Sequence, residues 1–278
     1  MASPRLPIAR TFPRLAALLL LTLALASCGG KKAPTAPTPV DPTPTPPAQP
    51  TPTPPAQPTP TPPPPTLRFT KFVGFGDSMT QGVTSATPTL LIRLDAPQAY
   101  PAILQGLLSL RYSAQTITVA NRGIAGEQAV DGMSRFIDVL RQDAPQVVII
   151  LEGFNDLTAF GDRGITRAVG AVESMVKEAR ARGVAVLLAT LPPERPGGPK
   201  TLPTGIYNEF NRQITGTASD EGAQLIDLSH EMSVASIGVD GIHPTEAGYQ
   251  EMAGIYFKHI QSLYEQAAQT TAAPAATH

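Results

Sequence analysis

Residues 147–151 constrain the fold of this chain more than any other stretch. They read Val-Val-Ile-Ile-Leu, five apolar residues with no polar residue among them. A strand with one face in water alternates apolar and polar residues, whereas a parallel strand covered by helices on both faces is apolar throughout. We therefore predict a parallel β-sheet that is covered on both faces.

The rest of the chain alternates in the way that such a sheet requires. Further strand candidates are residues 69–75, 117–120, 184–190 and 225–228, and helix candidates between and after them are residues 100–110, 130–141, 166–182, 204–219 and 245–266. Strands that alternate with helices predict a three-layer α/β/α fold with about five parallel strands. Residues 67–266, about 200 in number, suit one domain with a sizeable core.

The N-terminal part has a different composition. Residues 1–27 carry Arg5, Arg10 and Arg14 and then an apolar run, a pattern typical of a secretory signal, so we expect an exported protein. Cys28 is the only cysteine, which excludes an intramolecular disulfide. Leu25-Ala26-Ser27-Cys28-Gly29 resembles the lipobox of bacterial lipoproteins, which implies a lipidated Cys28 that anchors the protein at the outer membrane or cell surface. An ordinary cleaved signal is the alternative.

A proline-rich segment separates Cys28 from the expected domain. Residues 33–66 consist mainly of Pro, Thr, Ala and Gln, and the octapeptide TPTPPAQP occurs twice in succession. Such a segment favours extended polyproline II structure and forms no packed core, so we predict a linker over residues 28–66 that reaches on the order of 100 Å. A PxxP docking site is the alternative. The Ala/Thr-rich residues 267–278 are predicted to be disordered.

Polar residues follow the strand candidates where each one ends, the usual place for a site in an α/β protein. Four short blocks stand there or just ahead of the last helix: Gly76-Asp77-Ser78, Asn121 to Gly126, Glu152-Gly153-Phe154-Asn155-Asp156, and Asp240-Gly241-Ile242-His243-Pro244. A serine hydroxyl becomes a useful nucleophile only with a base that takes its proton and donors that stabilise the oxyanion. These blocks contain residue types for both tasks.

Asp240 and His243 lie three residues apart. In a short turn, a carboxylate can accept a hydrogen bond from one imidazole nitrogen while the other nitrogen faces a serine, so we predict a triad of Ser78, His243 and Asp240. Taken singly, Asp240-Gly241 also suits a plain turn, and Pro244 suits the start of a helix. The remaining histidines are weaker candidates: His259 and His278 fall in or after the expected last helix, and no motif surrounds His230.

Together, the four blocks resemble the SGNH, or GDSL, hydrolases, in the family's order and over essentially the whole expected domain. The resemblance implies a flavodoxin-like sheet, Ser78 as nucleophile, and His243 as base oriented by Asp240. It also implies an oxyanion hole formed by the backbone N–H groups of Ser78 and Gly126 and the side-chain amide of Asn155. Gly123 is the alternative to Gly126. Phe154 stands where the family commonly has glycine, and we expect it to reshape the pocket floor.

The sequence therefore predicts a serine esterase that forms an acyl-Ser78 intermediate on a small ester or acylated substrate. A carbohydrate O-acetyl esterase, a lysophospholipase and a thioesterase of the same fold are alternatives, and a non-catalytic surface-binding lipoprotein is the alternative from another class. We expect residues 84–99 and 192–203 to form the acyl-binding side, since such loops usually set specificity.

Other classes of site lack support. The G-x-S-x-G nucleophile elbow is absent, and no histidine precedes His230, as a trypsin-like order would require. Gly74-Phe75-Gly76 has Met79 in place of the third glycine of a dinucleotide motif. No residues show metal-ligand spacing, so we expect neither a cofactor nor a metal. The formal net charge of −1 gives no indication of a nucleic-acid partner.

Overall fold

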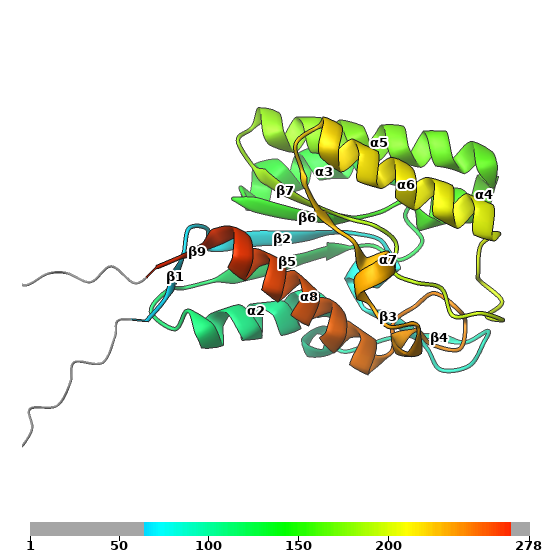
Figure 1. Ribbon diagram of the computed structural model, residues 1–278, viewed down its shortest axis with the longest axis horizontal. Helices are drawn as coiled ribbons and strands as arrows, with labels where there is room; N and C mark the ends of the chain where they lie inside the picture. Colours follow the sequence, from blue (N-terminus) through cyan, green and yellow to red (C-terminus); the bar gives the residue numbers. More distant parts are fainter. Residues whose placement is uncertain (1–63, 268–278) are drawn as a thin grey trace, which may run out of the picture. The chain divides into compact units, whose positions relative to one another are not determined.

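The computed structural model describes residues 64–267, and Cys28 and the linker lie outside these residues. A five-stranded parallel sheet forms the centre, with the strand order β5-β2-β6-β7-β8 (Figure 1). Its strands are β2 (Lys71–Gly76), β5 (Thr118–Gly123), β6 (Val147–Leu151), β7 (Ala185–Ala189) and β8 (Gln224–Ile226). In chain order this is the 2-1-3-4-5 arrangement of flavodoxin-like folds.

Helices cover both faces of the sheet. On one side lie α2 (Tyr100–Arg111) and α8 (Glu246–Tyr264), and on the other lie α3 (Ala129–Asp143), α5 (Asp162–Ala181) and α6 (Thr204–Asp220), as Figure 1 shows. All five residues of β6 are fully buried. The predicted three-layer α/β/α fold with five parallel strands is confirmed, and the unbroken apolar run is explained because helices cover this strand on each face.

The register of the sheet brings the polar blocks to one edge. Gly76 at the end of β2 is level with Gly123 at the end of β5 and with Leu151 at the end of β6. The segments that follow these three residues therefore start side by side. Parallel strands all present their carboxyl ends at the same edge, which is why blocks far apart in sequence can share one site.

Several short elements were not predicted. They are β1 (Thr66–Leu67) with β9 (Glu265–Gln266), the hairpin β3 (Val83–Ser85) with β4 (Leu91–Arg93), the helices α1 (Ser78–Gln81), α4 (Phe154–Phe160) and α7 (Leu228–Glu231), and the 3₁₀ turns η1 (Ala96–Gln98) and η2 (Val234–Ser236). The prediction of a loop at residues 84–99 is therefore wrong in part, because these residues contain most of the β3–β4 hairpin. The last helix ends at Tyr264, and the next two residues pair with β1 instead.

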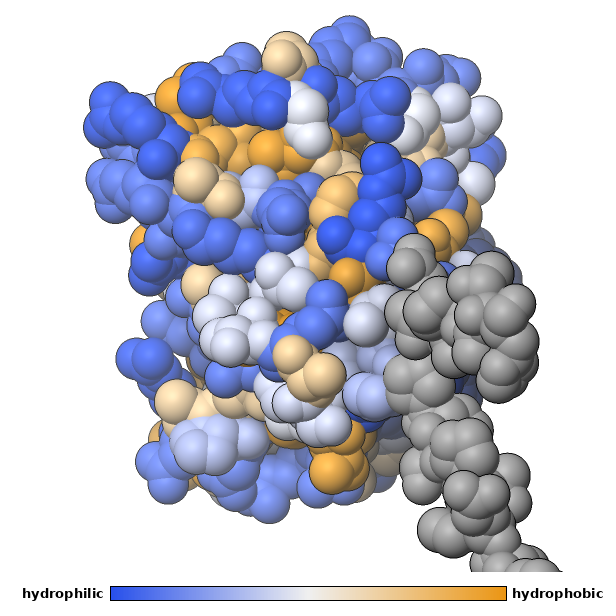
Figure 2. Space-filling view, turned by 90° about the vertical axis from the view of Figure 1, so that its left-hand side faces the viewer, coloured by the Kyte–Doolittle hydropathy of each residue, from blue (hydrophilic) through white to orange (hydrophobic). Residues whose placement is uncertain are grey.

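The strands β1 and β9 form a separate two-stranded sheet, which lies on the left-hand side in Figure 1, away from the polar blocks. Figure 2 shows this face, where hydrophilic residues surround separate apolar areas. Within residues 64–267, no helix combines the length and the apolar composition that crossing a bilayer requires.

Candidate active site

The turn after β2 fixes the position of Ser78. Asp77 is the N-cap of α1, and its Oδ1 accepts a hydrogen bond of 2.9 Å from the backbone N–H of Met79. Gly76 has no room for a side chain, since an added Cβ would lie 2.3 Å from Oγ1 of Thr80. The strand can therefore turn at once into α1, which places the Ser78 hydroxyl at the carboxyl edge of the sheet.

His243 joins Ser78 to Asp240. Its Nε2 lies 2.9 Å from Oγ of Ser78, and its Nδ1 lies 2.5 Å from Oδ2 of Asp240. All three residues are buried, with exposed fractions of 6%, 2% and 0% for Ser78, His243 and Asp240. In the neutral imidazole, an Nδ1–H that donates to Asp240 leaves Nε2 as the acceptor for the serine proton. The structure thus brings together the three residues that the sequence predicted.

The carboxylate of Asp240 is held in place by its own turn. Its Oδ1 accepts hydrogen bonds of 3.2 Å from the backbone N–H groups of Ile242 and His243. Gly241, between Asp240 and Ile242, has φ +103°, which favours glycine. Burial opposes ionisation, but the hydrogen bond and charge of His243 lower the pKa of Asp240 overall. Asp240 therefore stays an anionic acceptor beside the imidazole.

Gly126, and not Gly123, opens onto the space in front of Ser78. Gly126 has φ +82° and lines the same cavity as Ser78 and Asn155. Gly123 packs against α1, where an added Cβ would lie 2.2 Å from the backbone nitrogen of Gln81. Gly126 thus leaves the cavity open, whereas the absence of a side chain at Gly123 lets β5 approach α1.

The side-chain amide of Asn155 has two acceptors within the protein. Its Nδ2 lies 3.2 Å from Oδ2 of Asp77 and 2.9 Å from the carbonyl oxygen of Glu127. Asn155 belongs to the first turn of α4, which begins after Gly153 with φ +113°. These contacts hold the amide at the edge of the cavity beside Ser78.

Three buried carboxyl groups lie behind the site. Burial raises the pKa of Asp77 to about 6, raises the pKa of Glu152 well above its ordinary value, and also raises the pKa of Asp156. Oδ2 of Asp156 accepts a hydrogen bond of 2.7 Å from the backbone N–H of Ala129, the first residue of α3. Asp156 therefore connects α4 to α3.

A cavity of about 600 Å³ opens at Ser78 and His243. Its apolar lining comes mainly from Phe154, Leu157, Ile206 and Ile242. Phe154 is 5% exposed, so it belongs both to the cavity and to the core. Residues 199–203 of the predicted specificity loop also line the cavity, whereas the predicted loop at residues 84–99 contributes only Leu91. Within residues 64–267, no group of three or more side chains is arranged to hold a metal ion.

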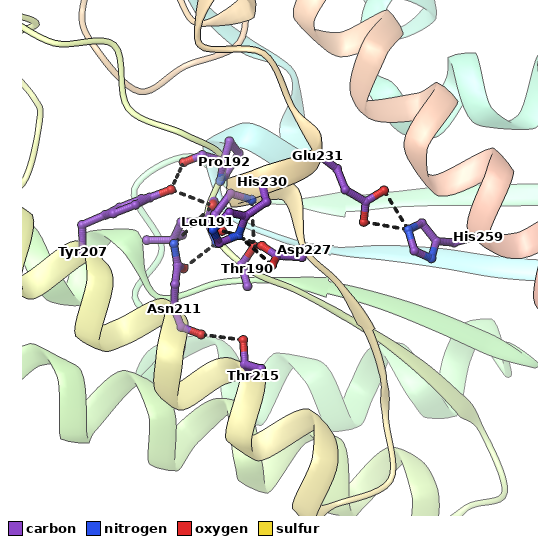
Figure 3. Close-up of polar contacts among 11 residues, drawn as sticks. Thr190, Leu191, Pro192, Tyr207, Asn211, Thr215, Asp227, His230, Glu231 and His259 are labelled. Atoms are coloured by element: carbon purple, nitrogen blue, oxygen red, sulfur yellow. Dashed lines mark hydrogen bonds and ion pairs between the residues drawn. The ribbon is translucent and has the colours of Figure 1, made fainter.

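A second Asp-x-x-His pair escaped the sequence interpretation. Asp227 and His230 have the same spacing as Asp240 and His243, and Nδ1 of His230 lies 2.8 Å from Oδ2 of Asp227 (Figure 3). The view that no motif surrounds His230 was therefore wrong. The repeated spacing was the signal that could have revealed the pair.

Comparison with known proteins places the chain in a family. The sequence profile of the GDSL-like lipase/acylhydrolase family matches residues 75–251, which span all four blocks. The chain belongs to this family. As a GDSL-family member it is a carboxylic-ester hydrolase, and the comparisons give no support to the non-catalytic alternative.

One relative resembles the chain in sequence, and two solved structures resemble it in fold. The chain is 32% identical over 161 residues to the esterase TesA of Pseudomonas aeruginosa, a match that covers 55% of this chain and 74% of that protein. The aryl esterase of M. smegmatis has a similar structure, with a TM-score of 0.61 and 21% identity over 70% of this chain and 99% of the other. Est24, a carbohydrate acetylesterase from Sinorhizobium meliloti, has a TM-score of 0.59 and 18% identity, and the match again covers 70% of this chain and 99% of the other.

Proposed function

We propose that this GDSL-family hydrolase cleaves carboxylic esters through an acyl-Ser78 intermediate. Nε2 of His243 takes the hydroxyl proton while Oγ of Ser78 attacks the ester carbonyl carbon. The tetrahedral intermediate then expels the alkoxide, which receives the proton from His243. In the second half, His243 takes a proton from water, the hydroxide attacks the acyl carbon, and Ser78 leaves with the proton as the acid is released.

One observation carries this proposal. The contacts Oγ–Nε2 at 2.9 Å and Nδ1–Oδ2 at 2.5 Å join Ser78, His243 and Asp240 in a single line. A hydrogen bond from Nδ1–H to Asp240 orients the ring and stabilises the imidazolium that forms during the attack. Burial of all three groups excludes water, which strengthens these interactions.

We assign the oxyanion hole to the backbone N–H groups of Ser78 and Gly126 and the side-chain amide of Asn155. The placement of Gly126 and Asn155 on the cavity that contains Ser78 supports this assignment. To donate to the oxyanion, the Asn155 amide must share or give up one of its contacts with Asp77 and Glu127. Hydrogen-bond donors to the developing oxyanion typically contribute a large part of the rate enhancement in acyl transfer.

The acyl group should bind against the apolar side of the cavity, where Phe154, Leu157 and Ile206 lie. Hydrolysis of p-nitrophenyl esters from acetate to decanoate, with Ser78→Ala as the control, tests the function and the acyl preference together. Activity in the parent and none above background in Ser78→Ala is the expected result. Equal activity in the two proteins would contradict the assignment of Ser78.

We further propose that the hydrolase is exported and anchored through a lipidated Cys28. The support is the signal-like pattern of residues 1–27 and the lipobox resemblance around Cys28. Two or more acyl chains at one residue would give stable anchoring, whereas one chain binds only marginally. Mass spectrometry of the mature N-terminus tests this: diacylated Cys28 supports it, and an unmodified soluble form refutes it.

A further inference from the structure

A second cavity, of about 890 Å³, lies beyond the ends of β7 and β8 and beside α6. Its volume falls within the range of about 300–1,000 Å³ that is usual for ligand pockets. It shares Thr201 and Leu202 with the cavity at Ser78, so the two are separated by one short stretch of chain. The mechanism proposed above uses neither this cavity nor the polar groups that line it.

Hydrogen bonds join the polar side chains beside this second cavity, and Figure 3 shows them. Oδ1 of Asp227 accepts from the hydroxyls of Thr190 and Ser229, at 3.1 Å and 2.5 Å, and Oδ2 lies 2.8 Å from Nδ1 of His230. Tyr207 donates its hydroxyl to the carbonyl oxygen of Pro192, at 3.0 Å. Contacts within the protein therefore position these polar side chains.

Helix α7, which carries His230, is itself held in place. Nε2 of His259 on α8 lies 2.8 Å and 2.9 Å from the two carboxylate oxygens of Glu231 on α7 (Figure 3). The side chain of His230 is 83% exposed, and its Nδ1 is engaged by Asp227. Its Nε2 is thus available to a ligand.

The cluster of Asp227, Ser229 and His230 is not a second hydrolytic centre. Oγ of Ser229 lies 2.9 Å from Nδ1 of His230, the same nitrogen that contacts Asp227. In a triad the serine and the carboxylate must face opposite ring nitrogens. The geometry instead suits a binding surface.

Charged ligands fit this surface poorly. The Arg212 guanidinium is bound to Glu209 by two hydrogen bonds of 2.8 Å and 2.6 Å, while the carboxylates of Glu194 and Asp227 face the cavity, so an anion would meet repulsion. A cation would find only Oε2 of Glu194 among these four carboxylate oxygens, since both oxygens of Asp227 are engaged and Oε1 of Glu194 accepts from the backbone N–H of Leu202.

A neutral ligand with many hydroxyl groups fits better. One hydroxyl can donate to Oε2 of Glu194 and another to Nε2 of His230, and a hydroxyl oxygen can accept from the amide of Asn208, since all three residues line the cavity. A long apolar chain would offer these polar groups no hydrogen-bond partner, and those that it covers would lose their water. The rings of Pro193 and Pro196 in the lining offer apolar contact for the carbon face of such a ligand.

Residues 195–200 directly precede Thr201 and Leu202, which both cavities share, and they are attached to the turn of the triad. The backbone N–H of Arg195 donates to the carbonyl oxygen of Gly241, at 2.8 Å, and that of Lys200 donates to the carbonyl oxygen of Asp240, at 3.0 Å. Gly198 packs so closely that an added Cβ would lie 2.2 Å from Cα of Gly241. Residues 195–200 are therefore fixed relative to Asp240, and a ligand in the second cavity has a defined position relative to the ester site.

We propose that this second cavity is a subsite for the saccharide part of an acylated saccharide whose ester lies at Ser78. The proposal rests on the esterase function of Ser78 for its role in turnover, but the binding of sugar to the cavity can be measured without it.

The test uses the full chain with Ser78→Ala, titrated calorimetrically with three unacylated neutral oligosaccharides: xylohexaose, cellohexaose and maltohexaose. Asn208→Trp and Thr215→Trp add bulk at exposed positions on the cavity side of α6, and Ser219→Trp is the matched control, since Ser219 is exposed on α6 but does not line the cavity. We expect at least one oligosaccharide to bind, and its affinity to fall about tenfold or more in both cavity variants but not in the control.

Two results would overturn the subsite. One is the absence of binding for all three oligosaccharides, and the other is equal affinity in the cavity variants and in Ser219→Trp. Hydrolysis of p-nitrophenyl acetate by the protein with Ser78 intact is measured in parallel. If the sugar binds as expected but this hydrolysis is absent, the proposed function fails while the binding site stands.

Discussion

The side-chain amide of Asn155 lies 3.2 Å from Oδ2 of Asp77, the residue directly before the nucleophile. Asp77 also accepts from the backbone N–H of Met79 through its other oxygen, so one carboxylate organises both α1 and the amide. The aspartate of the Gly-Asp-Ser block therefore does more than cap a helix. It orients one of the proposed oxyanion donors.

Replacement of Asn155 by alanine should lower kcat by about 10²- to 10³-fold, because one donor to the oxyanion is lost. KM for p-nitrophenyl acetate should change little, since this contact strengthens only in the transition state. Steady-state kinetics measure both constants. A variant that raises KM and keeps kcat would show that Asn155 acts in ground-state binding instead.

The activity should fall in acid for two reasons. His243 must be neutral to accept the serine proton. Asp77, whose pKa burial raises to about 6, should also protonate as the pH falls through 6, and it then becomes a weaker acceptor for the Asn155 amide. The profile of kcat/KM from pH 4 to 8 should therefore fall more steeply than one protonation allows.

Asp77→Asn provides the matched comparison for this profile. Because the asparagine does not titrate, the acid limb of Asp77→Asn should be less steep than that of the parent, whatever its overall activity. Acid limbs of the same slope and midpoint in the parent and in Asp77→Asn would exclude a contribution from Asp77.

Asp240→Asn should lower kcat by about 10⁴-fold, the scale seen when the carboxylate of a serine-protease triad is replaced by an amide. The amide can donate to Nδ1, which favours the tautomer that presents a proton to Ser78. Asp138→Asn, an exposed position on α3, serves as the control. A loss for Asp240→Asn no greater than that of the control would rule out the orienting role.

The two glycines of the second block should respond differently to alanine. Gly123→Ala forces a Cβ to within 2.2 Å of the backbone of α1 and should cost about 1–3 kcal/mol or more of stability. Gly126→Ala meets no neighbour within 4 Å and should cost about 1–2 kcal/mol, for its φ of +82° alone. Thermal unfolding measures the order, and a larger loss for Gly126→Ala would contradict the packing described above.

The sequence predicted the central fold because buried parallel strands and amphipathic helices leave direct periodic signals. The bounds of residues 147–151 agree with β6, and the helix at 100–110 falls within α2. The hairpin of β3 and β4 was missed because each strand has only three residues, too few for a period to show.

The site could be predicted in its residues but not in its contacts. Ser78 and His243 stand 165 positions apart, and motif order alone suggested that they meet. The contact of Asn155 with Asp77 depends on the register of β2 beside β6, which single-sequence patterns do not specify. Likewise, the spacing of Asp227 and His230 is visible in the sequence, but the cavity that they line is not.

Covalent labelling of Ser78 tests the central claim most directly. A fluorophosphonate transfers its phosphonyl group to an activated serine Oγ, with loss of fluoride, and peptide mass spectrometry identifies the modified residue. We predict one label per molecule, located on Ser78, and none in Ser78→Ala. A label that survives in Ser78→Ala, or a parent protein that takes up no label, would contradict the assignment of Ser78 as the nucleophile.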